Sequence, residues 1–494
     1  MGGTKRNALA SVATAVAGIA VALISTPLII DHVGRSGYGV WAVAMAVVVY
    51  LGILEAGFAP VAQRRVAAAL GSDDRAGAVR VFWSTLIFYL ALGVLAAAVV
   101  FLLAPVVAAL FDFPGDLETQ AVELLRIVAL AIPLGLLMAA LTNALQGAER
   151  FSAVAVTALM GALAYLVALA LLVRSGSSLS QLGWAVIAQL VVLIVARGAL
   201  ILELALSRPG VVSRAEAREM LSMSARLQVS VASLIVNGQS DRVVTGLVAP
   251  PATVAQVSIA AQVAEAGRLM AAAPLAPVTN RFSALEGAQE RERLESLFGE
   301  VDRQWVSLVT GAVAIGALCA VPLVEAWLGR GFLEAGLFAA ALVIAYGSSI
   351  VFGVRIALLR ALGRPGLESR TGLVLMALNL VFTVPLAILL DAPGVVAGTL
   401  LAYLAGAAWF VRRFQAAAPG FRPAGSADVV RSLAWGVLFG VPALGWCLLA
   451  VAFVPSGWAL IPVAAGMAAA ALAFLACALR MGPRTLLRSL GAGA

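Results

Sequence analysis

Seven polar residues recur at steps of three and four through the stretch Met220 to Val248: Ser222, Arg226, Ser230, Ser233, Asn237, Asp241 and Thr245. In a helix turning about 100° per residue, these steps keep all seven within roughly 140° of one face. One charged group at the bilayer centre costs about 2.5 to 3.5 kcal/mol on insertion scales, so Asp241 and the adjacent Arg242 need protein, water or a counter-charge beside them. The stretch predicts a helix that lines a polar pathway. The alternative is a surface amphipathic helix, or an Asp–Arg pair that snorkels to the outer headgroups.

A second polar set follows directly, at Ser258, Gln262, Glu265 and Arg268. Glu265 and Arg268 are three residues apart and therefore neighbours on one helical face. An arginine stays protonated near mid-bilayer, and its planar fork matches the oxygens of a phosphate, so Arg268 is the first candidate for binding an anionic diphosphate. Alternatively, Glu265 and Arg268 neutralise each other and hold helices together.

Three further charged residues, Arg197, Arg355 and Glu55, lie in apolar runs. Arg355 is near enough to the cytoplasmic edge to snorkel, which makes it the weaker cavity candidate. Glu55 could carry a coupling proton if burial raises its pKa, or it could pair with Arg64 or another cytoplasmic arginine. With Asn237, Asp241, Arg242, Gln262, Glu265 and Arg268, these residues make up the candidate substrate and coupling site.

The composition of the chain requires a membrane. Of its 494 residues, 62% are hydrophobic and 12% are charged, and the mean hydropathy is +1.03. No aqueous core could bury so much apolar surface. Runs long enough to span a bilayer occupy 8–30, 38–60, 81–111, 127–146, 153–173, 184–206, 226–248, 253–278, 304–328, 335–357, 371–390, 394–411, 432–454 and 457–479.

The basic residues orient these fourteen runs. With the N-terminus in the cytoplasm, and with Arg226 at the first position of its run counted as cytoplasmic, 25 of the 33 Lys and Arg residues fall in cytoplasmic segments, four in external segments and four in spans. The positive-inside rule therefore predicts a multi-pass protein of the cytoplasmic membrane with both termini in the cytoplasm. The net charge of +8 is then an orientation signal, and no domain is present that would bind nucleic acid.

Catalytic and cofactor motifs are missing from the sequence. There is no phosphate-binding loop, no Gly-x-Ser-x-Gly and no His-Glu-x-x-His, and Cys319, Cys447 and Cys477 have no metal-ligand spacing. The connections between runs reach only about twenty-five residues, which is too short for a catalytic or nucleotide-binding domain. We expect no enzyme, no metal and no cofactor, and an integral-membrane glycosyltransferase or polymerase is disfavoured.

An internal repeat divides the chain. Ala-Pro-Val-Ala-Gln-Arg at 59–64 recurs as Ala-Pro-Val-Thr-Asn-Arg at 276–281, and Ala104-Pro105 meets Val321-Pro322 at the same displacement along the chain. Six spans per half give two halves of like orientation. The predicted fold is an all-α membrane protein of about fourteen helices, with a six-helix lobe at 1–206, a second at 207–412, and two additional helices and a cytoplasmic tail at 413–494.

Three motifs carry a family resemblance: Gly-Arg-Ser-Gly-Tyr-Gly-Val-Trp at 34–41, Tyr-Leu-Gly-Ile-Leu-Glu-Ala-Gly-Phe at 50–58, and Gln-Ser-Asp-Arg-Val-Val at 239–244. Together with the order of spans, they resemble the polysaccharide flippase branch (Wzx type) of the multidrug/oligosaccharidyl-lipid/polysaccharide exporter superfamily. The resemblance implies two pseudo-symmetric lobes around a central cationic cavity, and alternating access.

The substrate implied by this resemblance is a polyprenyl-diphosphate-linked oligosaccharide, moved outward for cell-surface polysaccharide biosynthesis. Membrane lipids and a glycan polymerase or glycosyltransferases are the implied partners. The first span lacks the arginines that related lipid II flippases carry there, which disfavours a peptidoglycan precursor. A cation-coupled exporter of small drugs is the alternative, but four intramembrane arginines weigh against it.

Overall fold

The computed structural model describes residues 2–53, 58–172, 178–204, 232–233, 235–272 and 274–480. Every regular element within these ranges is helical, which confirms the all-α prediction. Helices occupy the described part of each of the fourteen predicted runs, and ten of the described helices are long and apolar enough to cross a membrane. Ten is fewer than fourteen because two long helices each contain two runs, and because the runs at 226–248 and 253–278 are partly described or more polar.

The two double-length helices are α1 (Gly2–Leu51) and α14 (Gly366–Ala417), and each breaks at one residue with positive φ, Gly34 (75°) and Asp391 (52°). Packing across the second break is very close. A Cβ on Gly394 would lie 1.9 Å from the carbonyl oxygen of Leu386, and one on Gly398 would lie 2.4 Å from the Cα of Thr383. The two halves of α14 therefore pack backbone to backbone, which only glycine permits at these positions.

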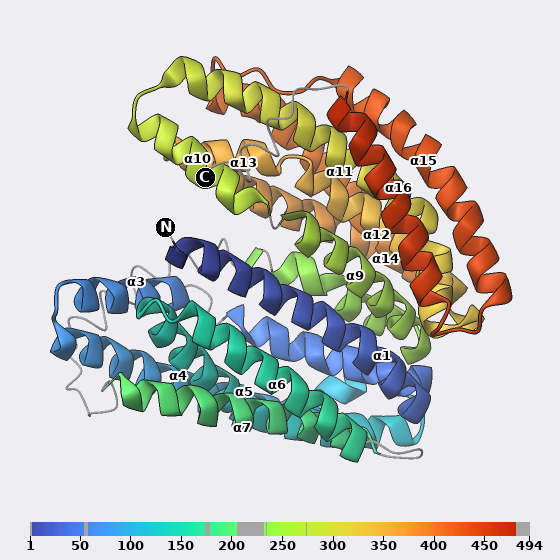
Figure 1. The fold of residues 1–494 in the computed structure, drawn as a ribbon. Coiled ribbons are helices and arrows are strands. Elements are labelled where there is room, and N and C mark those ends of the chain that lie inside the picture. The colour runs from blue at the N-terminus through green and yellow to red at the C-terminus, as the bar shows by residue number, and fades with distance from the viewer. Residues whose placement is uncertain are drawn as a thin grey trace. The chain divides into compact units, whose positions relative to one another are not determined.

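Two compact units divide the chain, Met1–Ala255 and Gln256–Ala494, with the boundary inside α9 (Pro251–Ala272). The lobe boundaries predicted from the repeat stay a prediction. In the first unit α5 packs against α4 and α7, and α6 packs against α7 and α1 (Figure 1). The helices of this unit after α1 are α3 (Phe58–Gly71), α4 (Arg75–Leu110), α5 (Asp116–Gly147), α6 (Phe151–Leu172), α7 (Ser180–Glu203) and a helix at 235–248.

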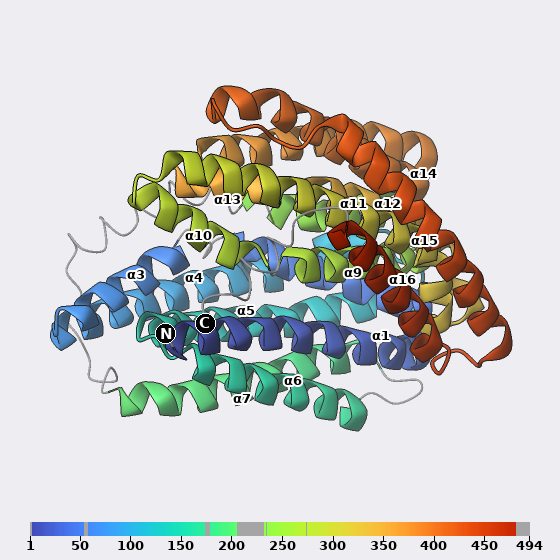
Figure 2. The same cartoon turned by 45° about the horizontal axis from the view of Figure 1, so that its top comes forward.

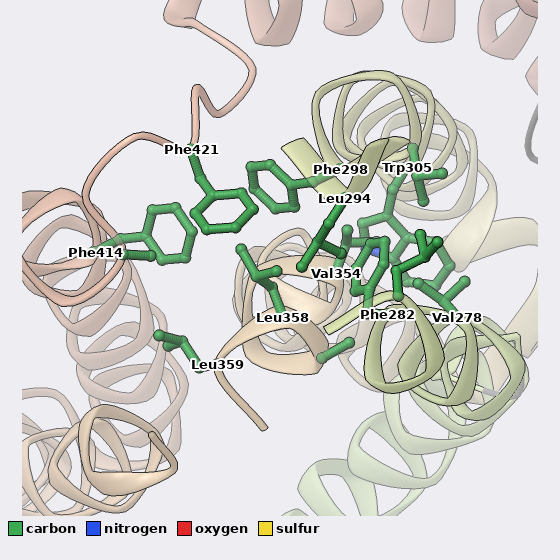
Figure 3. Packing of buried hydrophobic residues seen from close by; sticks show 14 of the residues in the cluster. Val278, Phe282, Leu294, Phe298, Trp305, Val354, Leu358, Leu359, Phe414 and Phe421 are labelled. Atoms are coloured by element: carbon green, nitrogen blue, oxygen red, sulfur yellow. The ribbon is translucent and has the colours of Figure 1, made fainter. Parts of the chain in front are cut away.

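In the second unit, α15 and α16 lie side by side and both pack on α11 (Figure 2). An aromatic cluster joins α10, α11, α13 and the end of α14, with Phe298 packed among Phe282, Phe414 and Phe421 (Figure 3). The elements of this unit after α9 are α10 (Leu275–Gly287), α11 (Arg291–Leu328), η1 (Arg330–Phe332), α12 (Leu333–Ile350), α13 (Gly353–Ala361), α14, α15 (Ser426–Phe453) and α16 (Leu460–Arg480).

The element boundaries follow the sequence repeat. The two copies of the repeated hexad, at 59–64 and 276–281, lie in α3 and α10 at the same displacement along the chain. α5 and α12 begin at Asp116 and Leu333, again at that displacement. Both short helices, α3 and α10, carry the hexad.

Prolines occur both just before a helix and within one. Pro274 precedes α10 as its N-cap. Pro133 lies inside the continuous helix α5, where a Cβ on Gly93 of α4 would be 2.8 Å from its Cα. Proline therefore coincides with a helix start at one position and with close helix packing at the other.

Candidate functional site

Glu265 and Arg268 form a two-pronged ion pair on α9. The Nε of Arg268 donates to Oε2 of Glu265 at 2.7 Å, and its Nη2 donates to Oε1 at 2.5 Å. The two side chains are 39% and 42% exposed, for Arg268 and Glu265 respectively. The i, i+3 spacing gives the pairing predicted from the sequence, while the exposure leaves the guanidinium accessible to a further anion.

Two tyrosines from other helices stand near this pair. Tyr346 of α12 and Tyr403 of α14 pack with ring centroids 5.2 Å apart, and both phenols lie within electrostatic reach of Arg268. Both rings are buried. Two phenols from α12 and α14 therefore lie within electrostatic reach of the ion pair on α9.

The rest of the polar face of α9 fixes the helix against α12. The side-chain oxygen of Gln256 accepts a hydrogen bond from the backbone N–H of Ala335 at 3.1 Å. Ser258 is buried, and Gln262, one turn before Glu265, is half-buried. Gln262 is thus the polar neighbour of the ion pair on the same helix.

The polar stripe of the preceding helix faces the interior of the first unit. Ser233, Asn237, Asp241 and Thr245, spaced by four, are all buried, whereas Leu247 is 53% exposed. Thr245 donates to the backbone oxygen of Asp241 at 2.6 Å. The alternative of a surface helix does not fit this burial. Ser222, Arg226 and Ser230 lie outside the described residues.

Arg242 is half-buried and does not pair with its neighbour in sequence. Its Nη1 donates to the side-chain oxygen of Gln239 at 2.5 Å, while Asp241 lies within electrostatic reach of Tyr50 on α1. The two adjacent charges therefore point to different surroundings, and Arg242 keeps its charge next to a neutral partner.

Arg197 of α7 is buried in the first unit, at 4% exposure. Its guanidinium donates to Thr157 Oγ1 (3.1 Å), Thr142 Oγ1 (2.6 Å), Met138 Sδ (2.7 Å) and the carbonyl oxygen of Val154 (3.4 Å). Among the residues that the structure describes, no carboxylate forms an ion pair with it. Arg197 thus crosslinks α5, α6 and α7.

Arg355 of α13 is buried as well, but it forms a complete ion pair. Its Nε and Nη2 donate to Asp302 of α11 at 3.1 Å, Nη2 also donates to the carbonyl oxygen of Ala424, and the backbone N–H of Ala424 donates to Asp302 at 2.8 Å. The guanidinium also faces the rings of Phe352 and Phe414. The sequence places Arg355 close enough to the cytoplasmic edge to snorkel, but in the structure Asp302 holds its guanidinium inside the unit.

The last predicted candidate, Glu55, lies outside the described residues. Neither Arg197 nor Arg355 belongs to the group around Arg268. In the part of the chain that the structure describes, no set of three His, Cys, Asp or Glu residues could hold a metal ion.

The model of one protein family, described as polysaccharide biosynthesis protein, matches residues 5–279. The chain belongs to this family. The match covers both the Asn237–Asp241 stripe and the Glu265–Arg268 pair. Among curated protein sequences, none matches the chain significantly.

Solved structures share the fold of this polysaccharide biosynthesis protein. The lipid II flippase MurJ in an inward closed conformation aligns with a TM-score of 0.72 at 14% identity, over 96% of this chain and 99% of MurJ. An inward-facing multidrug resistance MATE transporter of the MOP superfamily aligns at 0.66 and 16% identity, over 81% and 96%. A MOP superfamily transporter from Pyrococcus furiosus aligns at 0.58 and 16% identity, over 84% and 96%. At these identities the likeness establishes a multi-pass membrane fold used by transporters.

Sequence reasoning did not find Tyr346 and Tyr403. Each stands as a single polar aromatic group in an apolar run, with no periodic pattern to mark it. Both fall in the second half of the chain, on runs that carry few other polar groups. Only the packing of α12 on α14 brings the two rings together beside Arg268.

Proposed function

We propose that this protein is a flippase that moves a polyprenyl-diphosphate-linked oligosaccharide from the inner to the outer leaflet of the cytoplasmic membrane by alternating access. Its termini would lie in the cytoplasm, as the distribution of arginines predicts. The observation that carries the proposal is the half-exposed Glu265–Arg268 pair, backed by Tyr346 and Tyr403, in a chain of the polysaccharide biosynthesis family.

Arg268 is suited to binding the diphosphate because its guanidinium is planar and permanently charged. In the structure Glu265 accepts hydrogen bonds from two of the five N–H groups of Arg268, one on Nε and one on Nη2. A diphosphate would compete with this carboxylate for the same N–H groups. Arg268 would therefore pair with Glu265 when no substrate is bound and with the diphosphate when substrate is bound. Such an exchange keeps the cation paired in both states and limits the cost of holding it at membrane depth.

The other polar groups have proposed roles around this exchange. Arg242, whose described side-chain partner is a neutral amide, would provide a second cation, and Asn237, Asp241 and Gln262 would hydrogen-bond sugar hydroxyls. Glu55 is proposed to carry the coupling proton. Arg197 and Arg355 are left out of the proposed substrate site because their buried guanidinium groups already form hydrogen bonds within their own units, to Thr157 and Asp302 respectively.

A cation-coupled drug exporter is the second candidate, because a multidrug resistance transporter shares the fold and because Asp241 and Glu265 provide two acidic groups. Removing the protein from cells separates the two functions. The flippase proposal expects a polyprenyl-diphosphate-linked oligosaccharide to accumulate in the inner leaflet, detected by lipid extraction and mass spectrometry. Intact surface glycan with altered drug sensitivity alone would reject it in favour of the exporter.

A further inference from the structure

A lateral groove of about 490 Å³ runs along the contact between α6 and α7 in the first unit. Its walls are α6 from Ser152 to Met160, and Ala196 and Leu200 of α7. Both helices are long and apolar enough to span a membrane, and Val156 and Met160 are 58% and 45% exposed. A groove with this lining on the outside of two spans would face lipid, and its size is in the range of small-molecule sites.

A buried positive charge lies directly behind one wall of this groove. Thr157 lines the groove and accepts the hydrogen bond from Nε of Arg197. The guanidinium has five N–H groups, and the described residues provide it with four neutral acceptors and no carboxylate. Hydroxyls, a thioether and a carbonyl satisfy its hydrogen bonds, and the described part of the chain supplies no counter-ion for its charge. An anion at the groove would supply one.

The groove lies near one end of both helices. Ser152 and Ala153 belong to the first turn of α6, and Arg197 is six residues before the end of α7, about 9 Å along the axis. Exposed Arg150 immediately precedes α6, and the exposed carboxylates Glu149 and Glu203 lie at the same end. Arg197 differs from these surface charges because it is hydrogen-bonded to Thr157, a residue of the groove lining. On the predicted topology this end is cytoplasmic, in the leaflet that is richer in anionic lipid.

We propose that the α6–α7 groove is a binding site for an anionic phospholipid of the bilayer, separate from the site of the transported substrate. One acyl chain would lie along the apolar wall formed by Val156, Met160 and Leu200. The phosphate would lie at the Ser152 end, where it faces the charge of Arg197. The lipid would act as the missing counter-ion and would stabilise the three helices that Arg197 crosslinks.

The test uses the delipidated full-length chain in detergent, titrated with dioleoylphosphatidylglycerol and followed by native mass spectrometry. Ala153→Trp fills the groove without removing a side-chain hydrogen bond, and Ala170→Trp, at an exposed position at the other end of α6, is the matched control. We expect one tightly retained lipid in the wild type and in Ala170→Trp, and its loss in Ala153→Trp and in Arg197→Gln. Because Ala153→Trp leaves Arg197 and its partners in place, the proposal can be judged even if Arg197→Gln does not fold.

Two comparison ligands test which parts of the phospholipid the groove recognises. Zwitterionic dioleoylphosphatidylcholine should be retained at least about tenfold more weakly, a difference of one decade in affinity. Inorganic phosphate alone should not bind, because it cannot use the apolar wall. Equal retention of both lipids, retention of the anionic lipid by Ala153→Trp, or binding of free phosphate in place of lipid would each overturn the proposal.

Discussion

The two units of this protein treat a buried arginine in opposite ways. Arg355 in the second unit meets the carboxylate of Asp302 and the carbonyl oxygen of Ala424, so its charge is neutralised inside the protein. Arg197 in the first unit is buried to the same extent but meets only neutral acceptors among the described residues. The guanidinium of Arg355 is therefore fully paired within its unit. The guanidinium of Arg197 has no carboxylate partner among the described residues, so an external anion can pair with its charge.

Arg268 stands between these extremes. It has a carboxylate partner, as Arg355 does, but the pair is half-exposed and belongs to a single helix. An exposed i, i+3 pair contributes little to stability, so its arrangement has to be explained by what it can bind. The contrast predicts that the three arginines will rank differently in stability and in transport.

The largest loss of stability is expected from Asp302→Ala. This change leaves the guanidinium of Arg355 buried without its counter-charge and releases the backbone of Ala424, which should lower the free energy of unfolding by about 3 to 5 kcal/mol. Denaturation of the purified protein in detergent measures it. The double variant Asp302→Ala/Arg355→Met should recover part of the loss, because no unpaired charge remains. A double variant as unstable as the single one would show that the ion pair is not what holds Ala424.

Arg197→Met is expected to cost less, about 1 to 2 kcal/mol. It removes the hydrogen bonds to Thr157 and Thr142, but it also removes a buried charge that has no carboxylate partner in the described structure. Arg355→Met is the matched comparison, because it leaves the carboxylate of Asp302 buried without its counter-charge. It should be clearly more destabilising in the same thermal or denaturant assay. Equal losses for the two variants would remove the distinction between the units.

The smallest effect on stability is expected at the candidate site. Arg268→Gln and Glu265→Gln should each change the free energy of unfolding by less than about 1 kcal/mol, because the pair is half-exposed. Arg431→Gln, in the exposed i, i+3 pair with Asp428 on α15, should behave alike. A loss of several kcal/mol at Arg268 alone would mean that the Glu265–Arg268 pair is structural, the alternative that the sequence left open.

The sequence predicted the architecture well because membrane helices follow from local composition. Run lengths and the repeated hexad indicated the helices. The ion pairs Arg291–Glu295 and Arg293–Glu290 also link residues that are only three or four positions apart. The i, i+3 contact of Glu265 with Arg268 could also be predicted, since it needs only one helix.

Contacts between distant helices could not be predicted in the same way. Arg355 looked like a cavity or snorkelling residue because its partner, Asp302, is 53 residues away in a stretch that read as a cytoplasmic charged helix. The sequence did not predict the neutral acceptors of Arg197, and it did not predict that Tyr346 and Tyr403 pack together. In each case the environment depends on which helices pack together, which side-chain periodicity in one run does not specify.

The most direct test of the central claim is the amount of surface glycan in cells that carry Arg268→Ala as their only copy, compared with Arg431→Ala at equal protein abundance. We predict that glycan export is lost with Arg268→Ala, that its lipid-linked precursor accumulates in the inner leaflet, and that Arg431→Ala exports normally. Normal glycan with Arg268→Ala would contradict the assignment of the Glu265–Arg268 pair as the diphosphate site.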